Sequence, residues 1–598
     1  MTEDDLRALI GRVKHGKLSR RGFVRRVAAF GLTAPMATQL LAVTGAAHAQ
    51  STAVPAYKPT RRGGGGPLKI LYWQASTLLN PHFAQGTTNV EAARVFYEPL
   101  AGWAADGTLV PILAAEIPNT DNGTLAHDGK SVIWKLKPGV RWHDGTPFTA
   151  DDVVFNWEYS KNPAVAAVTS GSYKDITVVK VDDLTVRIEF QKPTPFWADA
   201  FVATRGMIIP KHLFKDYAGA NSRDAPANLR PVGTGPYRFV SFTPGDLLRG
   251  ELNPTYHQEN RPYFDTIEIK GGGDAVSAGR AVLQTGDFDY AWNLQVEEEL
   301  LARMEAAGRG KVEVVDCSDI EFMQLNTTDP NQEVDGERSS VRTTHPAFSD
   351  PAVRQAMGYL CDKNSLQQFI YGRAGIATAN FLNNPPRYRS NNLRWEFSIQ
   401  KANEVLDAAG WARGRDGIRA KNNVRLRFVY QTSVNAPRQR TQQLIKQAAQ
   451  RAGIDLELKS VVATVFFSSD VANPDTYPKF YADMQMYTTT MPEADPQTFM
   501  NQYVSWEVSQ KANSWQGRNV LRFRSEEYDR VFREAESEMD PVKRAALIIR
   551  LNDVVGSSNH IIPLLNRPRI RARLNNLRVV LTGWDADHWM LSDWYRET

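Results

Sequence analysis

The stretch WKLKPGVRWHDGTPFTADDV, residues 134–153, contains a strand end, a tight turn and a helix start in close succession. Ser131–Leu136 has the pattern of a strand. His143–Pro147 combines Asp, Gly and Pro, which are typical turn residues. Thr149 is placed to cap a helix that Asp151 and Asp152 open with acidic side chains. These are scaffold features, so they indicate the local fold and carry no information on function.

Strand patterns extend outward from this stretch and dominate from about residue 68 to residue 345. Leu68–Trp73 and Leu184–Phe190 are two further predicted strands. Helical periodicity rises after Asp350, which indicates an α/β protein of two lobes. The expected helices are Pro351–Phe369, Ile399–Ala409, Arg438–Ala452 and Glu526–Ser537, with a strand at Ile454–Leu458.

The N-terminus has the pattern of a twin-arginine export signal. Ser19–Arg25 (SRRGFVR) carries the paired arginines, and an apolar, uncharged stretch follows from Val27 to Gly45. Ala47-His48-Ala49 is a small-x-small cleavage site. The alternative is a short amphipathic helix with incidental basic residues. The order of the three elements predicts a signal peptide over residues 1–49, recognition by the twin-arginine translocon, cleavage after Ala49 and a periplasmic location. A flexible leader is expected at residues 50–66.

The net charge of +5 comes from this N-terminal segment. Beyond Ala49 the chain carries 63 basic and 63 acidic residues, which removes the electrostatic case for nucleic-acid binding. With 42% hydrophobic and 23% charged residues, the composition is that of a globular protein. Beyond the signal, no apolar run approaches the ~18 residues that a membrane span needs.

Sequence motifs for catalysis or metal binding are absent. The chain has no Gly-x-Ser-x-Gly elbow, no His-Glu-x-x-His helix and no Cys-x-x-Cys, and its histidines lack metal-ligand spacing. We therefore expect no enzyme activity, no cofactor and no metal. Two alternatives stay open: Cys317 and Cys361 could form one disulfide, and the polar loop 329–337 could bind a cation or be simply solvated.

Several segments in order resemble the bacterial solute-binding proteins of the dipeptide, oligopeptide and nickel class, family 5 of the ABC importers. The resemblance covers roughly residues 68–598. Its most specific part is residues 134–153. The other matching segments are Asn80–His82, Tyr97–Leu100, Pro111–Ala114, Val232–Tyr237, Asn253–Tyr256, Gly286–Tyr290, Asp350–Ala356 and Ala409–Trp411.

The resemblance implies a two-lobe type II periplasmic binding protein fold with an extra β-rich subdomain on lobe I. Lobe I would comprise residues 67–97, 213–318 and 561–598, the extra subdomain residues 98–212, and lobe II residues 319–560. A monomer would capture a small polar solute between the lobes and deliver it to a membrane permease with a cytoplasmic ATPase. The alternatives are an exported hydrolase, or a periplasmic chaperone or sensor partner that uses the same cleft.

The resemblance also implies ligand contacts in loops of both lobes. The candidates are Gln85, Gly86, Thr87, Thr88, Ser172, Tyr173, Trp292, Asn293, Tyr430, Gln431, Thr432, Tyr487, Thr488, Thr489, Thr490, Glu493 and Asp495.

One departure from the family pattern bears on the ligand. Peptide-binding members place a Trp and, three residues later, an Asp before an acidic-Pro pair, and that Asp holds the α-ammonium of the ligand. Thr489 and Pro492 stand at these two positions here. A buried ammonium without a carboxylate is strongly disfavoured. We therefore expect weak or no binding of unmodified di- and tripeptides, unless Glu493 or Asp495 supplies the carboxylate. The solute is expected to be peptide-like, or a sugar or opine-like conjugate.

Overall fold

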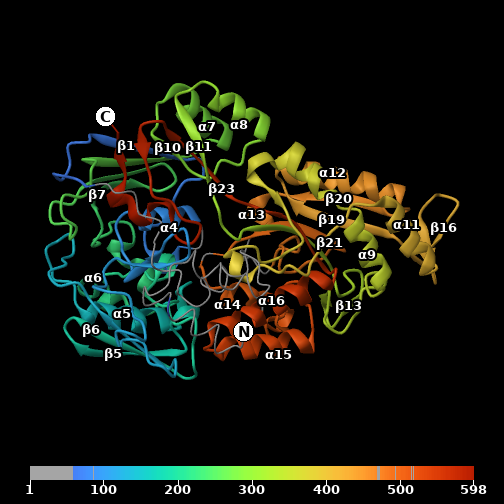
Figure 1. Cartoon of the computed structure of the whole chain (residues 1–598), viewed down its shortest axis with the longest axis horizontal. Helices are drawn as coiled ribbons and strands as arrows, with labels where there is room; N and C mark the ends of the chain where they lie inside the picture. Colours follow the sequence, from blue (N-terminus) through green and yellow to red (C-terminus); the bar gives the residue numbers. More distant parts are fainter. Residues whose placement is uncertain are drawn as a thin grey trace.

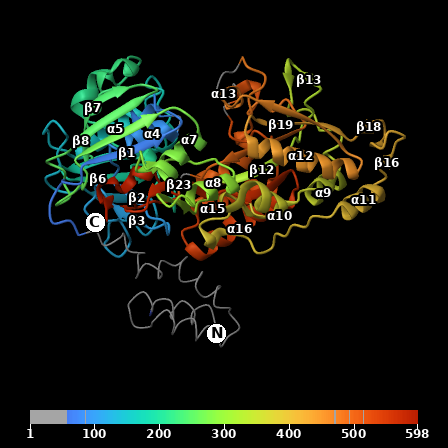
Figure 2. The same ribbon diagram turned by 90° about the horizontal axis from the view of Figure 1, so that it is seen from above.

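The computed structural model describes residues 58–84, 87–467, 472–491, 493–513, 515 and 517–597, together with Arg12. The expected signal peptide, apart from Arg12, and the leader up to residue 57 lie outside the described residues, as do Gln85, Gly86 and Pro492. Two α/β lobes lie beside each other (Figure 1), and the view from above shows the same division (Figure 2). Among the described residues, no helix combines the length and apolar character needed to span a bilayer.

The first lobe is built on a seven-stranded sheet. β1 lies parallel to both β9 and β10, and it alternates an exposed Pro67 and Lys69 with a buried Leu68 and Ile70. The order is β11 (Gly310–Val315), β23 (Arg569–Leu574), β10 (Tyr290–Ala291), β1 (Pro67–Tyr72), β9 (Thr266–Gly271), β8 (Leu247–Leu252) and β7 (Tyr237–Thr243). The expected strand at Leu68–Trp73 is thus present as β1.

The second lobe is built on a six-stranded sheet whose central strands are buried along their whole length. β12 and β22 expose none of their residues, so both faces of the sheet are covered. The order is β15 (Ile376–Ala377), β22 (Ile561–Asn566), β12 (Ile320–Leu325), β21 (Met484–Thr489), β19 (Arg427–Ser433) and β20 (Asp455–Val461).

One predicted lobe boundary is wrong. The sequence-based division gave residues 561–598 to lobe I, but β22 pairs antiparallel with β12 in the second sheet. The apolar run Ile561–Leu565 is buried there, and the chain returns to the first sheet only at β23. The change of lobe therefore falls at residues 567–568.

Residues 98–212 contain the local structure that the opening stretch predicts. Thr149 caps α5 (Ala150–Lys161) in a capping box with Asp152, as expected. Trp142 donates from Nε1 to Asp152 at 3.3 Å, which ties the turn to the helix. The strands β4 (Ser131–Lys135), β6 (Thr185–Phe190) and β5 (Ile176–Asp182) form a three-stranded sheet at the lower left of Figure 1, and β2 (Ala101–Trp103) pairs with β3 (Leu109–Pro111).

The predicted helix Pro351–Phe369 is interrupted. α9 ends at Tyr359, and Asp362 caps a new helix by accepting from the amide of Ser365. The pieces are α9 (Pro351–Tyr359), α10 (Lys363–Leu366) and a π-helical turn, Gln367–Tyr371. The other predicted elements are present as α11 (Ile399–Ala408), α12 (Ala436–Arg451), α15 (Glu526–Ser537) and β20.

Shorter elements complete the chain. The helices are α4 (Thr87–Ala93), α6 (Lys211–Phe214), α7 (Ala275–Arg280), α8 (Glu298–Glu305), α13 (Ala463–Phe466), α14 (Gln497–Met500) and α16 (Pro541–Ser557). The strands are β13 (Glu333–Val334), β14 (Glu337–Arg338), β16 (Ala412–Arg413), β17 (Arg419–Lys421), β18 (Val424–Arg425), β24 (Leu577–Arg578) and β25 (Tyr595–Arg596).

Two crossings join the sheets within the described part of the chain, at residues 316–319 and 567–568. Asn566 Nδ2 donates to the carbonyls of Cys317 at 2.9 Å and Asp319 at 3.0 Å. The two crossings therefore lie against each other and form a hinge of two segments.

The two alternatives left open by the sequence can be examined in the structure. Cys317 and Cys361 are free and buried, and burial raises the pKa of each thiol to about 12. The loop 329–337 carries the β13–β14 hairpin, and Lys511 Nζ donates to the carbonyls of Asp335 and Gly336. No cluster of three or more metal-ligating side chains occurs among the described residues.

Candidate functional site

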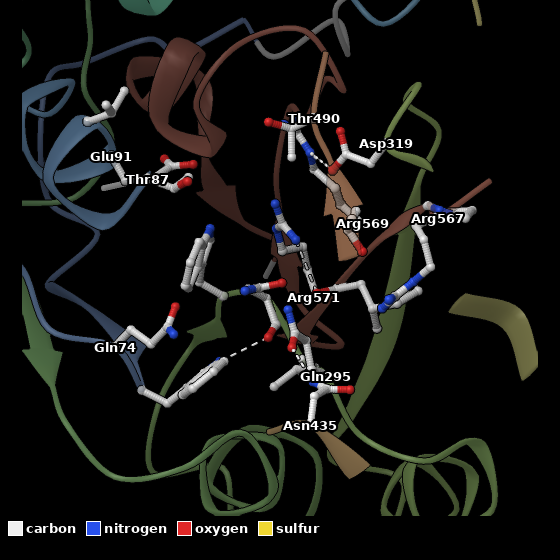
Figure 3. Close-up of a pocket in the computed structure, with 18 of the residues that line it drawn as sticks. Gln74, Thr87, Glu91, Gln295, Asp319, Asn435, Thr490, Arg567, Arg569 and Arg571 are labelled. Atoms are coloured by element: carbon white, nitrogen blue, oxygen red, sulfur yellow. Dashed lines mark hydrogen bonds and ion pairs between the residues drawn. The ribbon is translucent and has the colours of Figure 1, made fainter. Parts of the chain in front are cut away.

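A cavity of about 560 Å³ lies between the lobes, with walls from both sheets and both crossings. Figure 3 shows Gln74, Thr87 and Glu91 on one side and Arg567, Arg569 and Asp319 on the other. Its size falls within the ~300–1,000 Å³ of typical small-molecule sites.

Alternating arginines from the second crossing and β23 give the cavity its charge. Arg567, Arg569 and Arg571 are spaced by two residues, so they point to the same side of the extended chain. All three line the cavity. A fourth arginine, Arg438, comes from the first turn of α12.

Glu321 holds two of these arginines in place. Its carboxylate pairs with Arg438 at 2.8 Å and with Arg567 at 3.0 Å, and it exposes none of its side chain. Burial alone would raise the pKa of Glu321, but the two guanidinium groups outweigh burial and hold it below its ordinary value. The carboxylate is therefore ionised and fully used by protein cations.

Arg571 is fixed by a second buried carboxylate. Asp587 accepts from Arg571 Nε at 2.5 Å and from Nη2 at 3.0 Å, and also from the hydroxyl of Tyr290 at 2.6 Å. Burial and the neighbouring Asp587 together raise the pKa of Glu91 to about 8. At neutral pH Glu91 is therefore protonated, while Asp587 carries the charge.

Two more carboxylates border the cavity. Asp319 in the first crossing accepts from Arg569 Nε at 3.3 Å. Asp585 lies 3.8 Å from Arg94, and burial raises its pKa to about 6. Asp319 Oδ1 and Asp585 Oδ2 are buried without a hydrogen-bond partner among the described residues.

Aromatic and uncharged polar side chains form the remaining walls. The indole of Trp73 donates to the carbonyl of Asn293 at 2.9 Å, and Asn435 Nδ2 donates to Gln295 across the cleft at 3.3 Å. Trp292 packs on Tyr72 with ring centroids 5.2 Å apart. Such walls can hold an apolar or flat portion of a ligand while amides orient its polar groups.

Five of the residues predicted from the sequence line this cavity. They are Thr87, Trp292, Asn293, Thr488 and Thr490. Thr489 and Tyr487 do not, because successive side chains of a strand point to opposite faces. Tyr487 instead packs on Phe322, with ring centroids 4.7 Å apart.

The predicted contacts on β19 lie in the core of the second sheet. Tyr430 donates its hydroxyl to the sulfur of Met486, Thr432 donates to the carbonyl of Met486, and Gln431 donates to Gln485. β19 is an inner strand between β20 and β21, and the side chains of these three residues are buried against the rest of the second lobe. Residues 433–435, just beyond them, line the cavity instead.

Another group of predicted residues meets at a separate contact between residues 98–212 and the second lobe. Arg205 lies 3.2 Å from Glu493 and 3.9 Å from Asp199, and Ser172 donates to Asp199 at 3.1 Å. We call Ser172, Asp199, Arg205 and Glu493 the Arg205 cluster. The hydroxyl of Tyr173 donates to the backbone carbonyl of Arg205 at 3.1 Å, which helps to hold Arg205 in this position.

The remaining candidates also lie off the cavity. Asp495 binds Arg544 through both carboxylate oxygens, at 2.5 and 2.8 Å. Burial would raise the pKa of Asp495, but Arg544 holds it below its ordinary value. Thr88 is buried, and its carbonyl accepts from Ser76 at 2.9 Å. Neither Glu493 nor Asp495 is thus an unused carboxylate on the cavity wall.

Sequence reasoning missed the arginines. A signal was present, because RPRIRAR at residues 567–573 alternates arginine with other residues in the manner of a strand. Four cations on one side of an extended, largely buried segment require acidic partners or an anionic ligand. The partners Asp319 and Glu321 gave no such signal, since they lie in another part of the sequence.

Comparisons with known proteins agree with this architecture. Residues 108–511 match the family described as bacterial extracellular solute-binding proteins, family 5 Middle. The glutathione-binding protein GsiB of Pectobacterium atrosepticum is 28% identical over 56% of this chain and 60% of its own length. The oligopeptide-binding protein AppA of Bacillus subtilis is 25% identical over 80% of this chain and 81% of its own length.

Solved structures show the same fold. NikZ from Campylobacter jejuni, in complex with Ni(L-His), superposes with a TM-score of 0.71 at 21% identity, covering 89% of this chain and 99% of NikZ. AppA from Bacillus subtilis, in complex with a nonapeptide, gives 0.70 at 21% identity over 90% of this chain and all of AppA. The family match spans more than half of the chain, and the protein therefore belongs to the bacterial extracellular solute-binding proteins of family 5.

Proposed function

We propose that this protein is the substrate-binding component of an ABC import system. It captures a small polar solute between its lobes and delivers it to a membrane permease with a cytoplasmic ATPase. The observation that carries the proposal is the cavity of about 560 Å³ whose walls come from both lobes and both crossings. Membership of family 5 supports it, as do relatives named as glutathione-binding and oligopeptide-binding proteins.

Hinge closure is the proposed mechanism. A ligand that touches Thr87 in the first lobe and Thr488 in the second makes its full set of contacts only when the lobes are closed. Such differential contacts shift the population toward the closed form. We propose that the protein acts as a monomer. We also propose that it has no catalytic activity, because delivery of a solute to a permease needs only binding and release.

The solute is proposed to be peptide-like, with a sugar or opine-like conjugate as the second candidate. The relatives favour the first. The hydroxyls of Thr87 and Thr490, which can donate and accept, favour the second.

Native mass spectrometry of the purified protein tests this function. One small molecule should co-purify at a stoichiometry of one and be lost on partial unfolding. Adding the identified molecule back to the ligand-free protein, at 100 times its dissociation constant, should stabilise the fold by about 2.7 kcal/mol. The protein should also become more compact in X-ray scattering. Turnover of the bound molecule, or tight binding without compaction, would contradict a transport-binding role.

Export by the twin-arginine route is a separate proposal. It rests on Ser19–Arg25 and Ala47-His48-Ala49, with the mature chain beginning at Gln50 in the periplasm. Replacing Arg20 and Arg21 by lysine should leave unprocessed precursor in the cytoplasm. Normal processing of that variant would disprove the route without affecting the binding function.

A further inference from the structure

More guanidinium groups than charged carboxylates line the cavity. Glu91 contributes no negative charge at neutral pH, because its pKa is about 8. The guanidinium groups on the cavity wall are those of Arg438, Arg567, Arg569 and Arg571, and the other carboxylates on the wall are those of Asp319 and Asp585. Glu321 and Asp587 lie behind this wall and pair with Arg438, Arg567 and Arg571. The surface that a ligand meets is therefore mainly positive, in a partly enclosed space where charge is weakly screened.

Two arginines keep part of the guanidinium group free. Arg567 donates from Nε to the carbonyl of Ala374 and from Nη1 to Glu321. Arg569 donates from Nε to Asp319 and from Nη1 to the carbonyl of Asp585. Within the described ranges, Nη2 of each has no hydrogen-bond partner. The two side chains line the cavity and remain 15% and 18% exposed, so these donors are accessible to a ligand.

Other donors border the same space. α12 is a 16-residue helix that begins at the cavity, where its N-cap residue Asn435 and Arg438 in its first turn line the wall, which adds the positive end of its dipole. The indole Nε1 of Trp292 is buried on the cavity wall, without a partner in the described part of the chain. Both features favour negative charge in the ligand.

The acidic groups, by contrast, are already engaged. Glu321 and Asp587 each accept from arginine at 3.0 Å or less. Among the described residues of the cavity wall, the buried carboxylate oxygens without a hydrogen bond are Asp319 Oδ1 and Asp585 Oδ2, and these carboxylates face Arg569 and Arg94. A ligand ammonium would have to compete with a guanidinium group for either one.

We infer that the cavity selects a net-anionic solute whose carboxylate binds Nη2 of Arg567 and Arg569, and that a free α-ammonium adds little. This inference rests on the proposed function. A planar carboxylate suits paired guanidinium donors, because both its oxygens can accept.

A mixed tripeptide library in four terminal forms provides the test. The N-terminus is free or acetylated, and the C-terminus is free or amidated, so each charge is removed separately. Calorimetry with ligand-free protein should show that amidation weakens binding by about 10- to 100-fold, the range of a hydrogen bond to a charged group. Acetylation should change the dissociation constant by less than about threefold.

The outcomes separate the inference from the function. Equal binding of acid and amide, or a large loss on acetylation alone, would overturn the anionic selection while leaving solute binding intact. No binding by any form, together with no co-purifying molecule, would contradict the proposed function itself. A co-purifying molecule should be anionic at neutral pH; a neutral or cationic one would overturn the inference.

Variants locate the carboxylate. Arg567→Gln and Arg569→Gln should each remove most of the acid-over-amide preference, and Arg567→Lys should retain part of it because the charge remains. Arg303→Gln is the matched control, since that arginine pairs with Glu299 on the surface of α8 and is 69% exposed. Melting without ligand checks the fold. An unchanged preference in folded Arg567→Gln and Arg569→Gln proteins would disprove the assignment.

Discussion

Two of the places where the lobes exchange charged contacts, the hinge and the Arg205 cluster, are built in opposite ways. At the hinge, arginines surround an open cavity and two of them keep a free donor. In the Arg205 cluster, Arg205 forms an ion pair with Glu493 at 3.2 Å, and the Glu493 side chain is only 10% exposed. The cavity thus presents free guanidinium donors to a ligand, whereas in the cluster the cation is paired with a carboxylate and joins residues 98–212 to the second lobe. Recognition and lobe contact are assigned to different residues.

The largest effect expected is at the hinge. Glu321→Ala removes the carboxylate that holds both Arg438 and Arg567, and it leaves two cations facing each other. Removing one partner of a buried ion pair costs about 3–5 kcal/mol. Calorimetric melting should show a clear loss of stability. Glu299→Ala, at a position 88% exposed, should melt within about 0.5 kcal/mol of the parent; equal melting of both variants would refute the central role of Glu321.

A smaller, pH-dependent effect is expected in the Arg205 cluster. Burial and the nearby Asp199 raise the pKa of Glu493 to about 8, and burial also raises the pKa of Asp199. Above pH 8 Glu493 and Asp199 both carry a negative charge, and Arg205 is the main cation that faces them. Arg518 adds a weaker attraction, and Asp495 adds repulsion. The contact should weaken as pH rises.

X-ray scattering of the ligand-free protein between pH 6 and pH 9 measures this effect. The radius of gyration should increase through pH 8 in the parent and remain level in Glu493→Gln, which cannot ionise. A parallel increase in both proteins would show that the cluster does not control the approach of the lobes.

The smallest effect concerns Glu91. Its pKa is about 8 in the folded state against an ordinary 4.5, so its contribution to stability is complete below pH 4.5 and is lost as pH rises to 8. Glu91→Gln has no such loss. The variant should therefore gain in melting temperature relative to the parent between pH 5 and pH 8, and a constant difference between them across that range would contradict the assignment.

The sequence predicts the scaffold well where the signal is local. The Thr149–Asp152 capping box, β1 and the helix Glu526–Ser537 follow from patterns within a few residues. The predicted lobe boundary at residue 560 was wrong because the apolar sequence of Ile561–Asn566 fits a buried strand in either sheet, and only its pairing with β12 assigns it to the second.

The binding site is harder to predict, because its pairs are distant in sequence. Arg567 and Glu321 are 246 residues apart, and no local pattern joins them. The resemblance included Thr488 and Thr490, which line the cavity, but it also included Tyr430, which is buried in the core. A resemblance between segments does not tell which face of a strand is turned toward the cavity.

The placement of Arg567 and Arg569 within and directly after the second crossing has a mechanical consequence. A force applied on an axis of rotation exerts no torque, so a ligand held only by these arginines would not turn one lobe against the other. Torque must come from groups off the axis, such as Thr87 on one wall and Thr488 on the other. A fragment carrying just the carboxylate should consequently occupy the protein without closing it. Anchoring and signalling to a permease are then separable properties of one solute.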